Sequence, residues 1–64
     1  MPKVLLTQNG ARQFCFVDAD GGALIEAALS ENRASVTVQV ATPNGPPRKL
    51  TLNTAHIVGV EYED

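Results

Sequence analysis

The 64-residue sequence predicts one small, mainly β domain of five to six antiparallel strands, spanning residues 1–64. The strands are expected to form either a barrel or a sheet of two hairpins. Two observations lead to this prediction. The pairs Asn9-Gly10 and Asn44-Gly45 each lie between runs rich in β-branched and aromatic residues, and the last apolar run alternates with polar residues. Asn-Gly accepts the positive φ angles of a tight hairpin turn, so each pair predicts a hairpin.

The first hairpin is predicted to have the tighter turn. Residues 3–8 lead into Asn9-Gly10, and residues 12–17 leave it. A two-residue type I′ turn fits this spacing, because its twist matches that of two paired strands.

The second hairpin is predicted to have a looser loop. Residues 35–40 approach Asn44-Gly45 and residues 48–53 follow it. The intervening segment contains three prolines, Pro43, Pro46 and Pro47. Proline cannot donate to a strand ladder, so the predicted loop extends from residue 42 to residue 47.

Residues 23–30 have two competing interpretations. Alanine, leucine and glutamate favour an α-helix, which would give an α+β fold with a helix at 23–31. The alternation of Ile25, Ala27 and Leu29 instead fits a strand, and it resembles the alternation of residues 58–62. The strand interpretation implies an internal duplication of hairpin, connection and strand.

The last segment is predicted to contain a short helical turn and a strand. Asn53 is a good cap for a turn over residues 54–56. Residues 57–62 alternate and follow it directly, and the acidic tail at residues 61–64 is expected to be a solvated end.

The first hairpin carries apolar residues on both faces, with Phe14 and Phe16 opposite Cys15 and Val17. The strands of the second hairpin have one apolar face, which is expected to be buried and consists of Val36, Val38, Val40, Leu50 and Leu52. A core of this size supplies only about 3–5 kcal/mol. We therefore expect a homo-oligomer, a dimer or larger, that covers the extra face. The alternative is a monomer in which a helix or a curled sheet covers it. The predicted interface residues are Val4, Leu5, Leu6, Cys15, Val17, Pro43, Pro46 and Pro47.

Composition excludes several kinds of protein. The net charge of −2 and the few aromatic residues disfavour nucleic-acid binding. Phe14, Phe16 and Tyr62 are expected to lie mostly in the core. One cysteine and one histidine cannot form a disulfide or a closed metal site, and no cofactor is expected. The N-terminal apolar run is too short for a signal peptide or a membrane span, so a cytoplasmic location is expected.

No residue set predicts catalysis. Cys15 is expected to be a buried, unreactive thiol between two phenylalanines. Residues 18–22, Asp-Ala-Asp-Gly-Gly, lack the later ligands of a calcium loop and are interpreted as a turn. The candidate contacts for a small anionic ligand are Arg12, Arg33, Arg48, Lys49 and His56.

Several short strands, the early Asn-Gly hairpin and the helical turn before the last strand make the chain similar to the small SH3-like and Sm-like barrels. It also resembles the flagellar FlbD family in Leu6-Thr7, Asn9-Gly10, Leu24-Ile25-Glu26, Val36-Thr37-Val38, Ile57 and Val60-Glu61. These resemblances imply a binding protein without a catalytic motif. The basic loops with which Sm-like proteins contact RNA are missing here.

The sequence therefore predicts a non-enzymatic binding module, a small homo-oligomeric adaptor or regulator that contacts other proteins. The alternative is a protein that binds or sequesters a small anionic ligand or nucleotide between subunits.

Overall fold

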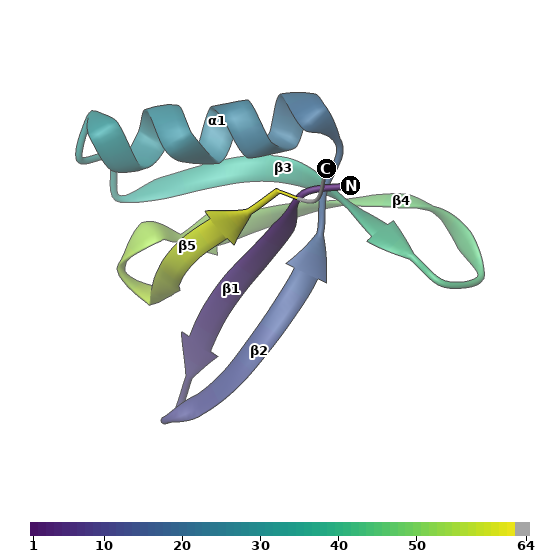
Figure 1. The fold of residues 1–64 in the computed structure, drawn as a ribbon, viewed down its shortest axis with the longest axis horizontal. Coiled ribbons are helices and arrows are strands. Elements are labelled where there is room, and N and C mark those ends of the chain that lie inside the picture. Colours follow the sequence, from purple (N-terminus) through teal and green to yellow (C-terminus); the bar gives the residue numbers. More distant parts are fainter. Residues whose placement is uncertain (63–64) are drawn as a thin grey trace.

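The computed structural model describes residues 1–62, which fold into two antiparallel sheets and one α-helix (Figure 1). The elements in chain order are β1 (Lys3–Gln8), β2 (Ala11–Phe16), α1 (Ala19–Ser30), β3 (Ser35–Thr42), β4 (Gly45–Asn53), the 3-10 helix η1 (Thr54–His56) and β5 (Ile57–Glu61). One sheet has the order β2-β1-β5, and the other is the pair β3-β4. The mainly β prediction is confirmed, but the described strands do not close into a barrel.

The β1–β2 hairpin has the predicted tight turn. Asn9 and Gly10 have φ angles of 51° and 79°, and Gln8 pairs with Ala11 on either side of them. Two consecutive positive φ angles define a type I′ turn, which the Asn-Gly pair favours.

The β3–β4 hairpin differs from the predicted loose loop. Its turn consists of Pro43 and Asn44 alone, since Thr42 already pairs with Gly45, and a bulge follows on the β4 side, where Pro46 and Pro47 lie opposite Ala41. The Thr42 hydroxyl lies 2.8 Å from the Gly45 carbonyl, to which it donates. The prediction was wrong because β4 is the edge of a two-stranded sheet, where proline is tolerated on the unpaired side.

Residues 19–30 form a helix, so the strand interpretation of residues 23–30 is wrong. The helix begins four residues before the predicted position, within the segment that was interpreted as a turn. Asp18 caps it, with its Oδ1 accepting from the Gly21 N–H at 2.6 Å. A Cβ at Gly21 would lie 2.9 Å from the Val17 Cβ. Glycine is used here because the first helical turn packs closely on the chain that enters it.

The predicted internal duplication is also wrong. The first hairpin is followed by α1, which packs mainly on β3. The second is followed by η1 and β5, and β5 pairs with β1 of the other hairpin. The two apolar segments after the hairpins therefore have different structures.

The capped turn before the last strand is confirmed. The Asn53 Oδ1 accepts from the Ala55 N–H at 3.0 Å. The Thr54 N–H donates to the Ala34 carbonyl at 3.0 Å, which fixes η1 against the start of β3.

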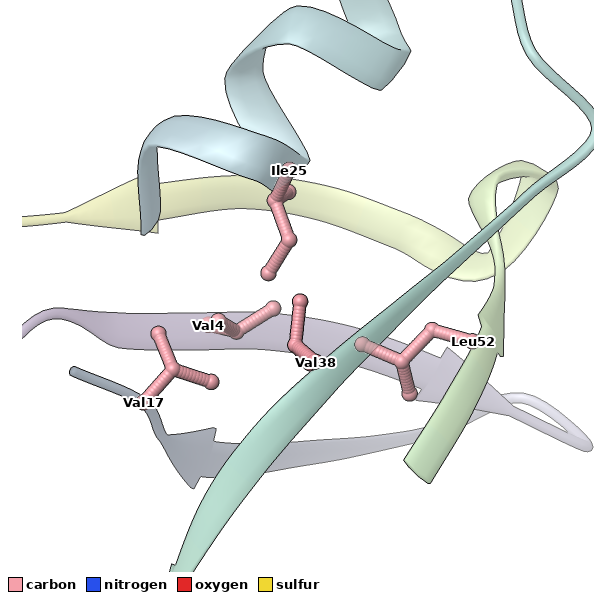
Figure 2. Packing of buried hydrophobic residues seen from close by; sticks show 5 residues of the cluster. All are labelled: Val4, Val17, Ile25, Val38 and Leu52. Carbon is pink, nitrogen blue, oxygen red and sulfur yellow. The ribbon is translucent and has the colours of Figure 1, made fainter. Parts of the chain in front are cut away.

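The core lies between the three-stranded sheet on one side and α1 with the β3–β4 sheet on the other (Figure 2). Its five central residues come from five different segments, Val4, Val17, Ile25, Val38 and Leu52. The predicted inward face of β3 is confirmed, since Val36 and Val40 pack against this cluster. Leu50, which was also predicted to face the core, is 42% exposed.

None of the three aromatic residues lies in the core as predicted, since Phe16 is half-buried but outside the core cluster. Phe14 is 57% exposed, and Tyr62 is 49% exposed. The Tyr62 hydroxyl donates to the Glu26 carboxylate at 2.8 Å and so fastens the end of β5 to α1. This hydrogen bond holds the pKa of Tyr62 above its usual range. The acidic residues 63–64, predicted to form a solvated end, lie outside the described residues.

Candidate binding surface

One face of the three-stranded sheet is left uncovered by the other residues of the described range, 1–62. Val4 points into the core, so Leu5 beside it points to the opposite face. Leu5 pairs with Phe14 of β2 on one side and with Gly59 of β5 on the other. Paired residues share a face, so these three form a row across the sheet. We call this surface the outer face, and its residues are Lys3, Leu5, Phe14, Phe16, Val58 and Gly59. The consecutive residues Val58 and Gly59 both belong to it because the β1–β5 register shifts there and leaves Val58 as the extra residue of a β-bulge.

Aromatic and aliphatic side chains dominate the outer face. Val58 is 66% exposed, which exceeds the exposure of Phe14. The rings of Phe14 and Phe16 meet edge to face, with centroids 5.6 Å apart. The Lys3 Nζ lies 4.4 Å from the centroid of the Phe14 ring. These contacts hold the Phe14 ring in one orientation before any partner binds.

Gly59 leaves an open notch in the same row. A Cβ added there would meet no heavy atom within 4 Å. Its φ angle lies outside the left-handed region, so the backbone does not require glycine. Glycine inside a strand weakens the strand, and it often marks a place where another chain or a ligand comes close. The row therefore has a projecting ring at one end, Leu5 in the middle and a notch at the other end.

The predicted interface residues are found on the core side of the sheet, on the outer face and at the β3–β4 turn. Val4 and Val17 are fully buried, which puts them in the core rather than on a contact surface. Leu6 and Cys15 are half-buried and pack against that core. Leu5 lies on the outer face. The three prolines, Pro43, Pro46 and Pro47, are exposed at the β3–β4 turn.

Sequence reasoning missed Phe14, Phe16 and Val58 as contact candidates. The alternation correctly placed Phe14 and Phe16 on the face opposite to Cys15 and Val17. The predicted interface, however, contained Cys15 and Val17 instead of the two phenylalanines. The exposed side follows from where α1 and β3 pack, which the alternation of one hairpin does not encode.

The predicted cationic residues do not meet at one site. Arg12 lines a hollow of about 280 Å³ with Leu5 and Val58. Arg48 lines a separate hollow at the β3–β4 turn. Lys49, the next residue along β4, points to the opposite face. Arg33 lies in the loop before β3 and forms an ion pair of 2.8 Å with the exposed Glu31.

His56 lines a third hollow, a groove of about 340 Å³ between the β1–β2 hairpin and β4. Leu6, Leu50 and Leu52 supply its apolar surface. Thr51 also lines the groove, but its hydroxyl bonds to the Thr37 hydroxyl at 2.8 Å. None of the lining residues is an acid, lysine or arginine, so the groove suits an uncharged group better than an anion.

The remaining titratable groups of residues 1–62 include a half-buried thiol and no cluster that could hold a metal ion. Burial raises the pKa of the Cys15 thiol, which disfavours the nucleophilic thiolate. Within residues 1–62, no three histidine, cysteine, aspartate or glutamate side chains lie close enough to hold a metal ion. Over the same residues, no helix has the length and apolar character needed to cross a membrane.

Comparisons of the chain with protein-family models, with curated proteins and with solved structures found no match.

Proposed function

We propose that the protein is a non-enzymatic protein-binding module, a small homo-oligomeric adaptor or regulator that acts through the outer face. The uncovered row of Phe14, Leu5 and Gly59 carries this proposal. The helix that could have covered the extra apolar face packs on the core side instead, so the apolar surplus of the first hairpin remains on the surface. A contiguous apolar patch of this kind is typical of interfaces.

Phe14 is the expected centre of binding energy. It is large, exposed and already oriented by Phe16 and Lys3. Full burial of a phenylalanine side chain contributes about 1.5–3 kcal/mol. Aromatic residues that are fixed before binding lose little conformational entropy, which suits a contact residue.

The test compares Phe14→Thr with Leu24→Gln. Threonine suits a strand, so Phe14→Thr should leave the fold intact. Leu24→Gln removes an apolar side chain of similar exposure from α1 and is the matched control. We expect Phe14→Thr alone to weaken both self-association in sedimentation equilibrium and the capture of proteins from an extract of the native host. Equal behaviour of the wild type and both variants would contradict the proposal.

A second candidate function is the binding of a small anionic ligand between subunits. One observation favours it: Arg12 lies beside Leu5 and Val58, at the border of the outer face. An interface on that face would bring Arg12 close to the second subunit. We expect nucleotides or inorganic phosphate to raise the melting temperature of the wild type and not of Arg12→Gln, with Arg48→Gln as the control. Identical melting curves with and without these anions would rule this function out.

We also propose that the fold is an open relative of the small SH3-like barrels. The support is the isolated bridge between Val17 and Val40, which links the end of β2 to β3. Through this bridge the strands follow the order β5-β1-β2-β3-β4.

A further inference from the structure

We infer that the occupant of the outer face is a second copy of this chain, related by a two-fold axis parallel to β1, so that Phe14 of each copy seats on Gly59 of the other. This inference rests on the proposed function and specifies its partner and geometry.

The first argument is the surface area. The 6.8 kDa chain exposes 4576 Å². A compact monomer of that mass exposes about 3,950 Å², which leaves a surplus of about 600 Å². A stable dimer at the small end of the usual range buries about 600 Å² per subunit. One dimer contact would therefore bring the exposed area to that of an ordinary folded protein.

The second argument is the balance of buried and exposed apolar residues. Within the described residues, six hydrophobic residues are buried and seven large ones are exposed. Of the three most exposed, Met1, Phe14 and Val58, the last two lie together on the outer face. The core is thus smaller than the apolar content of the sequence allows. Burial of the outer face against a second copy adds a second apolar layer without lengthening the chain.

The third argument is shape. β1 is the central strand of its sheet, with β2 on one side and β5 on the other. A two-fold axis along β1 places β2 of one copy over β5 of the other and keeps each row opposite itself. The projecting Phe14 ring then faces the notch at Gly59, and Leu5 lies on the axis. An axis across the strands would instead place ring on ring and notch on notch, which packs poorly.

Single-stranded nucleic acid fits the outer face less well than a second copy does. Base stacking needs an accessible ring face. Lys3 covers one face of the Phe14 ring, and Phe16 meets it edge to face. The net charge of −2 also repels a polyanion.

The test first fills the notch at Gly59 with a side chain and then removes the ring of Phe14. Gly59→Leu should raise the dimer dissociation constant by about tenfold or more, because leucine occupies the seat of Phe14. Gly45→Leu adds the same side chain at the exposed β3–β4 turn and should leave the constant unchanged. Phe14→Ala should weaken the dimer as well. The double variant Phe14→Ala/Gly59→Leu should associate more tightly than the two single effects together predict, because leucine then fills the space that the ring has left.

The outcomes separate this inference from the proposed function. A dimer that Gly59→Leu leaves unchanged, or single effects that simply add in the double variant, would overturn the Phe14–Gly59 geometry. A wild type that stays monomeric would overturn the inference, while Phe14-dependent capture of another protein would still support the proposed function. Binding of labelled single-stranded DNA by a monomer, lost in Phe14→Ala, would overturn both. Circular dichroism at low concentration checks folding. If Gly59→Leu does not fold, Phe14→Ala and Gly59→Ala carry the test.

Discussion

Cys15 lies on the core side of β2, next to the exposed Phe14. This one-residue difference separates a core-facing position from an exposed one, because neighbouring residues of a strand point to opposite faces. Cys15 pairs with Val4 across the sheet and packs against the core, and burial raises the pKa of its thiol. Phe14 and Cys15 therefore differ both in side-chain exposure and in what their side chains can contact.

We predict that Cys15 reacts slowly with iodoacetamide in the folded protein. The pKa of the Cys15 thiol is higher in the folded chain than in the unfolded chain. The contribution of this thiol to stability is therefore fully present below the unfolded pKa, and it is lost as the pH rises through the folded pKa. At pH 8 the labelling rate should be several-fold lower in buffer than in urea. The control is Cys15→Ser/Ser30→Cys, whose thiol sits at the exposed end of α1. Equal rates for Cys15 in buffer and in urea would refute its burial.

The two Asn-Gly pairs have different structures despite their identical sequence. Gly10 has a positive φ angle, whereas Gly45 does not. Alanine at position 10 should lower the free energy of unfolding by about 1–2 kcal/mol, the cost of a left-handed residue with a Cβ. Alanine at position 45 should leave stability unchanged or raise it by up to about 1 kcal/mol. Urea denaturation of the two variants measures this contrast, and equal losses would show that both turns need glycine.

Among the secondary-structure elements, those stabilised by local contacts could be predicted from the sequence. Asn9-Gly10 sets its own turn, and Asn53 caps the turn that follows it. The start of α1 could not be predicted, because Gly21 and Gly22 are poor helix formers. Gly21 packs closely on Val17, and Gly22 packs closely on Pro2 and Tyr62, which are distant in the sequence. The pairing of β5 with β1 is also long-range, and alternation within a strand does not encode its neighbour.

Asp18 should be essential to the first turn of α1. Its carboxylate accepts from the Gly21 N–H, one of the backbone groups that have no partner within the helix. Asp18→Ala should cost about 0.5–2 kcal/mol of unfolding free energy. Asp18→Ser, which restores a cap, should recover most of it. Asp20→Ala, also in the first turn, should cost less because Asp20 does not occupy the cap position. Chemical denaturation gives the three unfolding free energies. A larger loss of stability from Asp20→Ala than from Asp18→Ala would show that Asp18 is not the cap.

At the scale of the whole molecule, the three-stranded sheet has two apolar faces, and the described residues cover only one of them. α1 and the β3–β4 sheet complete the core around Val4 and Ile25. The outer face, with Phe14 and Val58, has no such cover within the described residues. The oligomer expected from the sequence was inferred from the apolar surplus of the first hairpin, and the structure assigns that surplus to particular side chains. Which face stays uncovered could not be predicted, because it depends on where the helix packs.

Native mass spectrometry of the wild type and of Phe14→Thr, at matched concentrations and after gentle purification, tests this account most directly. We predict a wild-type species at twice the 6.8 kDa chain mass and a variant at the chain mass alone. A wild type at the chain mass over the whole accessible concentration range, or a dimer that survives in Phe14→Thr, would contradict the assignment of the outer face as the surface through which this protein associates.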